Sequence, residues 1–216
     1  MFEPNFTKEK ELHYRRKIKL YYQPLAALAG LSLDPVSTSR WAELIFLGRA
    51  IDGYIDMSQL ASLHDREAEV LAWLPAPQNL ASASLPNLIQ LGKKHLSSLA
   101  RDTSVILELN REFKSAKTVS DFIAPRSKEG ALYARMILGC ATPEVYQQPN
   151  YQKFSRILVT GGVALNLANS ARGLQGDHLA GQTALEPTIY NSMALMAAAI
   201  KVLTSSTLTD ELHSTV

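Results

Sequence analysis

The feature that most constrains the fold of this chain is the helical spacing of its apolar residues. Apolar side chains recur every three or four positions, as at Leu44, Leu47, Ile51 and Ile55, which places them on one face of an α-helix. Signals for strands are missing, because no run alternates apolar with polar residues and no Asn-Gly or Asp-Gly pair joins two such runs. The sequence therefore predicts an all-α fold, built as a helical bundle around one apolar interior.

Proline and glycine residues indicate where the helices begin and end. Gly30 is expected to stop the first helix, Pro24 to kink it, and a break over 173–181 to precede the last helix. The expected helices cover residues 7–29, 37–64, 65–73, 86–100, 102–116, 126–140, 150–172 and 186–204, with a loop over 76–85. These elements predict one helical domain over residues 1–204 and a polar C-terminal tail over 205–216.

Composition narrows the class of protein. With 46% hydrophobic residues this chain of 216 can form a core, and a net charge of only +2 does not indicate nucleic-acid binding. The single cysteine, Cys140, cannot form an internal disulfide, which favours a reducing compartment. The sequence has no apolar core of a signal peptide and no apolar run of about 20 residues, so a soluble cytoplasmic protein is expected.

Two aspartates four residues apart form the first candidate site. The segment Arg49-Ala-Ile-Asp52-Gly-Tyr-Ile-Asp56 places both carboxylates on one helix face beside the apolar stripe, where like charges repel. A Mg²⁺ ion would relieve this repulsion, because it prefers carboxylate oxygens and keeps water and phosphate ligands. The alternative is a solvated acidic edge on which Arg49 neutralises Asp52.

The second candidate site is a group of polar residues inside an otherwise apolar helix. Buried amides and hydroxyls need hydrogen-bond partners, which a metal ion or a phosphate could supply. Hydrogen bonding between helices of the core is the alternative. The polar residues are Asn166, Asn169, Ser170, Arg172 and, if the helix continues past Gly173, Asp177.

Together the two segments resemble the squalene/phytoene synthase family of class I isoprenoid enzymes. That family has a first motif Arg-x-x-Asp-x-x-x-Asp and a second that reads roughly Gly-x-Ala-x-Gln-Leu-x-Asn-Ile-Leu-Arg-Asp-x-x-x-Asp. The matching residues are Arg49, Asp52 and Asp56 in the first motif, and Gly162, Ala164, Leu167, Asn169, Arg172 and Asp177 in the second. Tyr133 and Gly139 are similar to a Tyr-x-x-x-x-x-Gly element that precedes the second motif. The chain departs from the pattern at Gly53, Asn166 and Gly173, and the last of these removes an expected acidic metal ligand.

The resemblance implies a bundle with a central apolar cavity, in which Mg²⁺ binds a prenyl diphosphate that ionises to an allylic cation. Such a protein is a prenyltransferase (a transferase) or a terpene synthase (a lyase) of isoprenoid biosynthesis. The implied catalytic metal ligands are Asp52, Asp56 and Asp177, with Asn169 as a further ligand or a partner of the metal shell. The implied substrate contacts are Arg49 and Arg172 at the diphosphate, Asn166 and Ser170 in the upper cavity, and Leu47, Tyr54, Ile137 and Val163 along its interior. Asn169 is also implied as a substrate-binding residue.

Other classes of function stay open on the sequence. A non-catalytic helical scaffold or regulatory subunit, or an isoprenoid- or lipid-binding protein, would keep the same fold without turnover. The basic stretch over residues 15–19, followed by Tyr21 and Tyr22, suggests a peripheral membrane contact, with a solvated helix face as the alternative. A homodimer is compatible with the sequence, and no nucleic-acid partner is expected.

Overall fold

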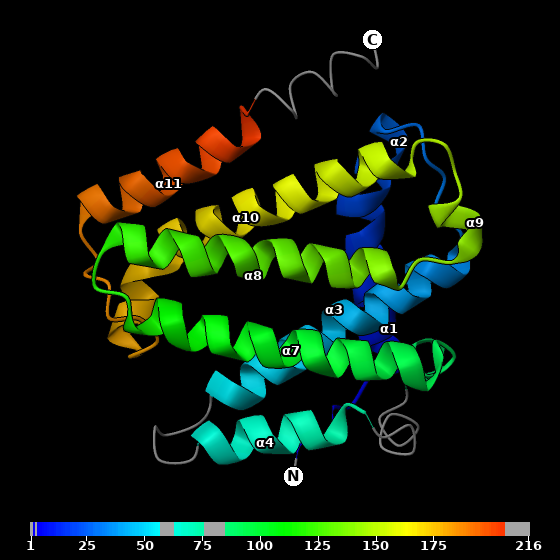
Figure 1. The fold of residues 1–216 in the computed structure, drawn as a ribbon, viewed down its shortest axis with the longest axis horizontal. Coiled ribbons are helices and arrows are strands. Elements are labelled where there is room, and N and C mark those ends of the chain that lie inside the picture. The colour runs from blue at the N-terminus through cyan, green and yellow to red at the C-terminus, as the bar shows by residue number, and fades with distance from the viewer. Residues whose placement is uncertain (1, 3, 57–62, 76–84, 206–216) are drawn as a thin grey trace. The chain divides into compact units, whose positions relative to one another are not determined.

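The computed structural model describes residues 2, 4–56, 63–75 and 85–205, and every regular element in these ranges is helical (Figure 1). The side chains of Asp56 and Leu63 lie outside this description, as does the predicted tail beyond Ser205. The prediction of an all-α helical bundle is confirmed. No helix within these ranges combines the length and the apolar character needed to cross a membrane.

The described part of the chain forms short and long helices in the following order. The N-terminal run consists of α1 (Lys8–Lys17), the π-helix η1 (Ile18–Tyr22) and α2 (Gln23–Leu28). The remaining helices are α3 (Pro35–Asp56), α4 (Leu63–Trp73), α6 (Pro86–Ile89), α7 (Gly92–Ser115), α8 (Val119–Gly139), α9 (Pro143–Tyr146), α10 (Tyr151–Leu179) and α11 (Ile189–Leu203).

The helices group by their internal contacts into two compact units. Unit 1 comprises residues within 1–104 and 136–151, and unit 2 comprises residues within 105–135 and 152–216. The chain passes from one unit to the other inside α7, inside α8 and after the first residue of α10. The single domain over residues 1–204 stays a prediction, as does the central apolar cavity.

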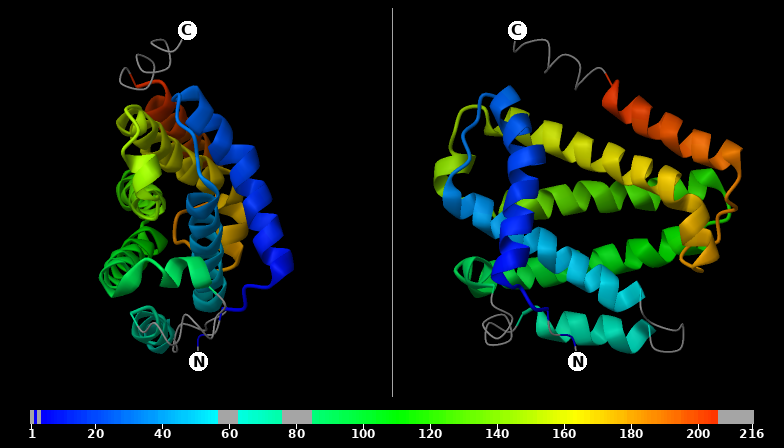
Figure 2. Two further views of the ribbon diagram at one scale, coloured as in Figure 1. Left: turned by 90° about the vertical axis from the view of Figure 1, so that its right-hand side faces the viewer. Right: turned by 180° about the vertical axis from the view of Figure 1, so that it is seen from behind.

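The core of unit 1 forms where the N-terminal run crosses α3, as both views in Figure 2 show. Residues of the run at every fourth position turn inward: Tyr14 and Tyr22 are half-buried, and Ile18 and Ala26 are buried. Aromatic rings hold the crossing together, with the ring centroids of Tyr14 and Phe46 5.8 Å apart. Buried aromatic surface of this kind supplies much of the free energy that stabilises a helix pair.

The N-terminal run differs from the expected kinked helix in one respect. Thr7 caps it, since its side-chain oxygen accepts a 3.3 Å hydrogen bond from Lys10 N. Gly30 ends it as predicted, with the positive φ of 72° that glycine adopts without strain. Pro24 does not simply kink the run, because the π-helix η1 lies just ahead of it and α2 begins at Gln23. A proline at the second position of α2 replaces an N–H group that this turn does not need.

Helix α3 begins at Pro35, two residues earlier than predicted, because Asp34 caps it. One carboxylate oxygen of Asp34 accepts hydrogen bonds from Val36 N at 2.7 Å and Ser37 N at 2.9 Å. The other accepts hydrogen bonds from the hydroxyls of Ser37 and Thr142, each at 2.7 Å. One side chain therefore caps α3 and ties it to the chain ahead of α9.

Two further boundaries in unit 1 differ from the prediction. Helix α4 begins at Leu63 rather than Asp65. Helix α7 is unbroken from Gly92, which corrects the predicted separation between residues 100 and 102. The break occurs instead at Gly92, whose φ of 79° suits glycine alone.

Unit 2 contains two boundaries that the sequence interpretation placed wrongly. Helix α8 begins at Val119, seven residues before the predicted start, because Thr118 and Asp121 cap each other. The Thr118 hydroxyl accepts from Asp121 N at 3.2 Å and donates to the Asp121 carboxylate at 2.7 Å. Pro125 lies inside the helix, which continues through it.

Helix α10 continues to Leu179, so the predicted break at residue 173 is wrong. It packs against α8 at a glycine crossing in which a Cβ atom added to Gly130 would lie 2.8 Å from Gly162 O. The two backbones touch there because neither residue carries a side chain. Around this crossing the core of unit 2 includes Phe113, Phe122, Leu167, Leu174, Leu185 and Leu195.

Candidate functional site

The first motif lies in the C-terminal half of α3, in unit 1. The Arg49 guanidinium and the Asp52 carboxylate form a 3.4 Å ion pair, with 66% and 52% of their side chains exposed. This pair agrees with the alternative of a solvated acidic edge on which Arg49 neutralises Asp52, and both groups remain accessible to a solute. Asp56 lies in the last turn of α3, but its side chain is outside the described part.

A pocket of about 510 Å³ opens beside the first motif. It brings Arg49 together with Lys10 of α1, so two cationic side chains face one hollow. Gly53 lies open there, with nothing within 4 Å of the position that a Cβ atom would take. The other lining residues are Phe2, Pro4, Asn5, Tyr14, Phe46, Ala50 and Tyr54. Two cations beside apolar walls suit an anionic amphiphile.

Tyr54 lines this pocket with its ring, while its polar groups are bonded to α4. The Tyr54 hydroxyl donates a short hydrogen bond to Glu69, and the Arg66 guanidinium donates to Tyr54 O at 2.7 Å. The bond to Glu69 raises the pKa of Tyr54 and lowers the pKa of Glu69, because it stabilises the phenol and the carboxylate. The Arg66 guanidinium also lies 5.0 Å from the centre of the Tyr54 ring. Tyr54 therefore joins α3 to α4 and is half-buried.

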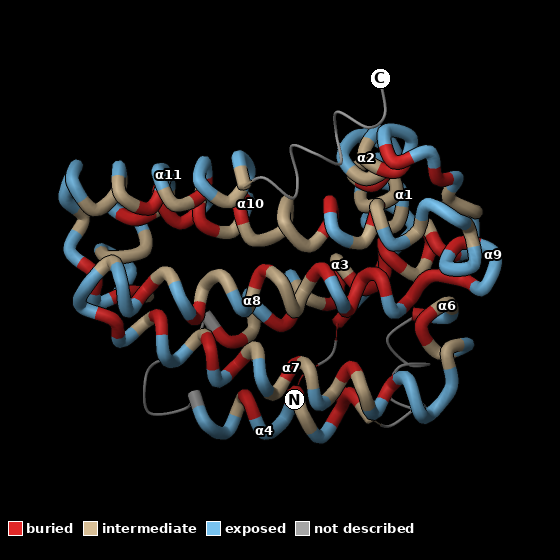
Figure 3. Tube along the Cα trace, turned by 45° about the horizontal axis from the view of Figure 1, so that its top comes forward, coloured by how far each residue is buried: buried red, intermediate tan, exposed pale blue. Residues whose placement is uncertain are grey.

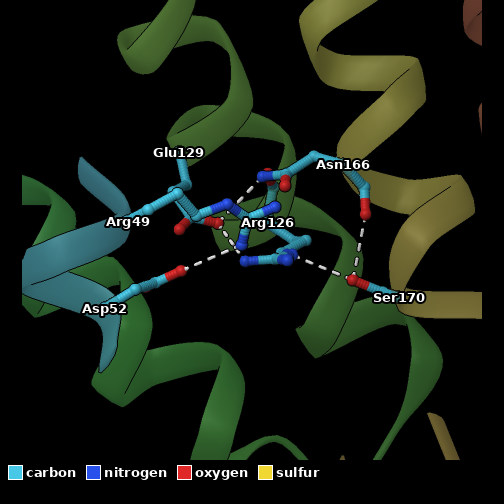
Figure 4. Close-up of polar contacts among 6 residues, drawn as sticks. All are labelled: Arg49, Asp52, Arg126, Glu129, Asn166 and Ser170. Atoms are coloured by element: carbon cyan, nitrogen blue, oxygen red, sulfur yellow. Dashed lines mark hydrogen bonds and ion pairs between the residues drawn. The ribbon is translucent and has the colours of Figure 1, made fainter. Parts of the chain in front are cut away.

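The second motif contributes two residues to a hydrogen-bonded network in unit 2 (Figure 4). Arg126 of α8 donates from Nε to Ser170 Oγ at 2.9 Å and forms an ion pair with Glu129. Asn166 donates from Nδ2 to the Glu129 carboxylate at 2.9 Å and to Arg126 O at 3.2 Å. Ser170 completes the network by donating to Asn166 O at 3.0 Å.

The burial of this network bears on whether Asn166 and Ser170 contact a substrate or form hydrogen bonds between helices. Only 19% of the Arg126 side chain and 12% of the Glu129 side chain are exposed, so the ion pair is largely removed from water. Burying such charges is costly unless hydrogen bonds satisfy them, and Asn166 and Ser170 supply those bonds. The alternative of interhelical hydrogen bonding therefore describes these two residues, and their predicted contact with substrate has no support in the geometry.

Asn169 and Arg172 lie elsewhere on α10, and both are exposed. They line an open pocket of about 460 Å³ whose other walls are Ala168, Ala171, Ser192, Met193 and Met196. The methionines come from α11, whose buried residues follow the side that packs toward α10 in Figure 3. An amide and a guanidinium thus stand beside a surface of methyl and thioether groups.

Asp177 lies one turn beyond Gly173 on the same face of α10, as predicted for a continuing helix. Its carboxylate covers Gly173, so that a Cβ atom at residue 173 would lie 3.3 Å from Asp177 Oδ2. The resembled motif has an acidic residue at position 173, whereas here the carboxylate of Asp177 lies over Gly173. Asp177 is half-buried.

Three other predicted residues lie in packed surroundings. Leu47 and Ile137 are buried in unit 1, and Val163 packs against the core of unit 2. Cys140 is buried, which raises the pKa of its thiol to about 12, so it is a core thiol.

The carboxylate oxygens at the two motifs are the kind of ligand that Mg²⁺ prefers, but the described residues supply few of them. Within the described ranges, no group of three or more His, Cys, Asp or Glu side chains could hold a metal ion. Mg²⁺ commonly uses only one or two carboxylates and completes its shell with water and phosphate oxygens. Asp52 and Asp177 are each able to serve in that way.

The sequence interpretation missed Arg126 and Glu129, which organise the middle of α10. Both residues lie in the predicted helix over 126–140, and their three-residue spacing could have indicated an ion pair on one helix face.

Comparison of the chain with known proteins returned no matching family model, no matching curated protein and no matching solved structure.

Proposed function

We propose that this chain is a Mg²⁺-dependent enzyme of the class I isoprenoid type, which acts on a prenyl diphosphate. The reaction is ionisation of the allylic diphosphate, followed by prenyl transfer or by terpene cyclisation. The proposal rests on the resemblance of both motifs and on one structural observation. Asn169 and Arg172, two residues assigned to substrate by the resemblance, line one pocket with the apolar side chains of α10 and α11.

That pocket has the two kinds of surface that a prenyl diphosphate needs. Arg172 can pair with phosphate oxygens, and a guanidinium does so with several N–H donors at once. Met193 and Met196 present flexible, polarisable groups that adapt to an isoprenoid chain. In unit 1, Arg49 and Lys10 beside the apolar walls of the other pocket offer the same combination.

Four residues would hold Mg²⁺ in this proposal: Asp52 and Asp56 on α3, and Asn169 and Asp177 on α10. When bound, the ion would neutralise the charge that collects on the leaving diphosphate. Arg49 and Arg172 are the cationic residues that the resemblance assigns to the diphosphate, and each is able to bind and orient such an anion. Asn166 and Ser170 are positioning residues here, because they hold Arg126 and Glu129 and so fix α10 against α8.

A second candidate function, an isoprenoid- or lipid-binding protein without turnover, is favoured by Gly173. This residue replaces an acidic ligand of the resembled motif, and the Asp177 carboxylate covers it. A site with fewer carboxylates binds Mg²⁺ less tightly, yet Arg172 still attracts a diphosphate. The same residues would then bind the prenyl diphosphate without catalysing a reaction.

Incubation with geranyl, farnesyl or geranylgeranyl diphosphate and Mg²⁺ tests the proposal. We expect pyrophosphate release that falls at least tenfold in Asp52→Asn and in Arg172→Gln. Glu108→Gln and Arg135→Gln remove exposed side chains of the same charge outside both pockets and should leave release unchanged. No release with any of the three substrates contradicts the enzyme proposal. Thermal stabilisation by the diphosphates that depends on Arg172 would then favour the binding protein.

Restoring the missing acid provides an independent test of the metal site. Gly173→Asp places a second carboxylate beside Asp177, and the Cβ atom meets only the end of a side chain that can move. If this part of α10 binds Mg²⁺, the concentration of Mg²⁺ that gives half-maximal thermal stabilisation should fall in Gly173→Asp. Gly173→Asn is the uncharged control, and an equal effect of both substitutions would argue against a metal.

A further inference from the structure

The N-terminal run carries a row of exposed residues at every fourth position. Every fourth residue from Lys8 to Leu28 is exposed, in the order Lys8, Leu12, Arg16, Leu20, Pro24 and Leu28. The leucines are strongly exposed, at 63% for Leu12, 60% for Leu20 and 52% for Leu28, and Tyr21 beside them is 64% exposed. Together these residues form the outer stripe. Large apolar groups gathered in this way on a charged helix usually mark an interaction surface.

The π-helix reduces how far this stripe winds around the helix axis. In an α-helix a step of four residues overshoots a full turn, so residues at this spacing drift around the axis. A π turn contains more residues, and a step of four then falls short of a full turn. Because η1 (Ile18–Tyr22) lies between α1 and α2, the two drifts oppose each other along the run. The π-helix thus keeps Leu12, Leu20 and Leu28 on one side.

The same run concentrates positive charge. Residues 8–28 contain six basic and two acidic side chains, a net charge of +4, whereas the whole chain carries +2. The remainder of the chain is therefore net negative by two charges. Glu11 forms a 2.8 Å ion pair with Arg15, which leaves the outward basic side chains to Lys8, Arg16 and Lys19. An anionic partner is the electrostatic complement of this face.

We propose that the outer stripe is a docking surface for the headgroup region of an anionic lipid bilayer. Leucines mixed with lysine and arginine on one helix face are the pattern of a helix that lies in a membrane interface. Leu12, Leu20 and Leu28 enter the boundary of the acyl chains, and Tyr21 lies at headgroup level. Arg16 and Lys19 reach lipid phosphates while their aliphatic stems stay beside the leucines. This inference is independent of the proposed enzymatic function.

A bilayer fits the stripe better than a nucleic acid does. Phosphate groups of a nucleic acid would engage the basic residues but would leave three exposed leucines in water. In an anionic membrane interface both kinds of side chain have a partner. Each basic residue then contributes about a fivefold gain in partitioning, and each buried leucine about tenfold.

Vesicle co-sedimentation of the full chain tests the proposal. We expect binding to vesicles of phosphatidylcholine mixed with phosphatidylserine, and little binding to phosphatidylcholine alone. The double variant Leu12→Ser/Leu20→Ser should lose binding by at least tenfold at unchanged vesicle charge. Leu165→Ser/Leu179→Ser is the matched control, since these leucines of α10 are 62% and 79% exposed. Circular dichroism of every variant confirms that the helical content is unchanged.

Two double variants that remove basic side chains separate the electrostatic contribution to vesicle binding from the contribution of the leucines. Arg16→Gln/Lys19→Gln should weaken binding strongly at low salt, whereas Lys93→Gln/Lys94→Gln, exposed on α7, should not. Three results would overturn the proposal: no binding of the natural chain to anionic vesicles, binding that the leucine variant retains, and a change in oligomeric state in place of a change in vesicle binding. The second result would indicate a site for polyanions, and the third a contact between copies of this chain.

Discussion

At the scale of single residues, the second motif divides into side chains that face inward and side chains that face outward. Asn166 and Ser170 complete the shell of a buried ion pair, while Asn169 and Arg172 remain exposed at a pocket. All four are polar residues of one helix, and the sequence alone could not tell which of them have partners. The difference is set by where α8 lies, which is a tertiary property.

The paired asparagines give a direct test of this division. Asn166→Ala should lower the free energy of unfolding by about 1–3 kcal/mol, because the largely buried Glu129 carboxylate loses a donor. Asn169→Ala should change it by less than about 0.5 kcal/mol, since the side chain is exposed. Urea denaturation measures both values. Equal losses in the two variants would contradict the division.

Asp34 gives a prediction about pH. Burial by itself raises the pKa of Asp34, but hydrogen bonds from Ser37 and Thr142 and from the backbone of Ser37 and Val36 outweigh it, so the pKa lies below its ordinary value of 3.8. A carboxylate with a lowered pKa stabilises the fold above its unfolded pKa, and this stabilisation is lost as the pH falls through the folded pKa. The free energy of unfolding should therefore decrease with acid below pH 3.8. Asp34→Asn should make that decrease shallower, which thermal melts over an acid series would show.

At the scale of helices, the periodicity of apolar residues predicted most of the helices, but it did not predict where they begin and end. The predicted starts of α1 and α11 are close to the observed ones, because Thr7 and Thr188 supply caps next to a periodic run. The predicted start of α8 is seven residues too late, because the cap at Thr118 was not recognised in the sequence. Helix α10 was ended too early because Gly173 was taken as a stop, whereas packing on both sides of this residue keeps the helix intact.

At the crossing of α8 and α10, the effect of an alanine substitution on the free energy of unfolding should depend on which of two adjacent glycines is replaced. A Cβ atom at Gly162 would lie 3.0 Å from Gly130 O and 3.2 Å from Ala134 Cβ, whereas one at Gly161 meets nothing within 4 Å. Gly162→Ala should therefore lower the free energy of unfolding by about 1–3 kcal/mol through overpacking. Gly161→Ala should raise it by up to about 1 kcal/mol, because alanine favours the helix. Calorimetric unfolding of both variants measures the two signs, and a loss in Gly161→Ala would contradict the geometry.

At the scale of the whole molecule, the candidate residues come from both units. Arg49, Asp52 and Tyr54 belong to unit 1, while Asn169, Arg172 and Asp177 belong to unit 2. The sequence predicted correctly that the first motif and the second motif up to Arg172 are helical, but it placed Asp177 on the face of Gly173 only on the condition that the helix continued. It could not predict the two pockets, because Lys10, Met193 and Met196 enter them from helices that carry no motif.

Whether the two motifs hold one ligand is measurable as coupling. If Asp52 and Asp177 share a Mg²⁺–diphosphate complex, the loss of affinity in Asp52→Asn/Asp177→Asn should be smaller than the sum of the two single losses. Independent sites would give additive losses. Titration calorimetry with a non-hydrolysable prenyl diphosphate analogue and Mg²⁺ distinguishes the two outcomes, and additivity would contradict a common site.

The π-helix at Ile18–Tyr22 sets the phase between the two halves of the N-terminal run. If all residues of this segment were kept but wound as an ordinary α-helix, everything before it would be rotated by about 100°, the step of one residue, about the helix axis relative to everything after it. Leu12 and Arg16 would turn away from the line of Leu20 and Leu28, and Tyr14 would leave its place against Phe46. The π turn thus decides whether this stretch has one outer side or two.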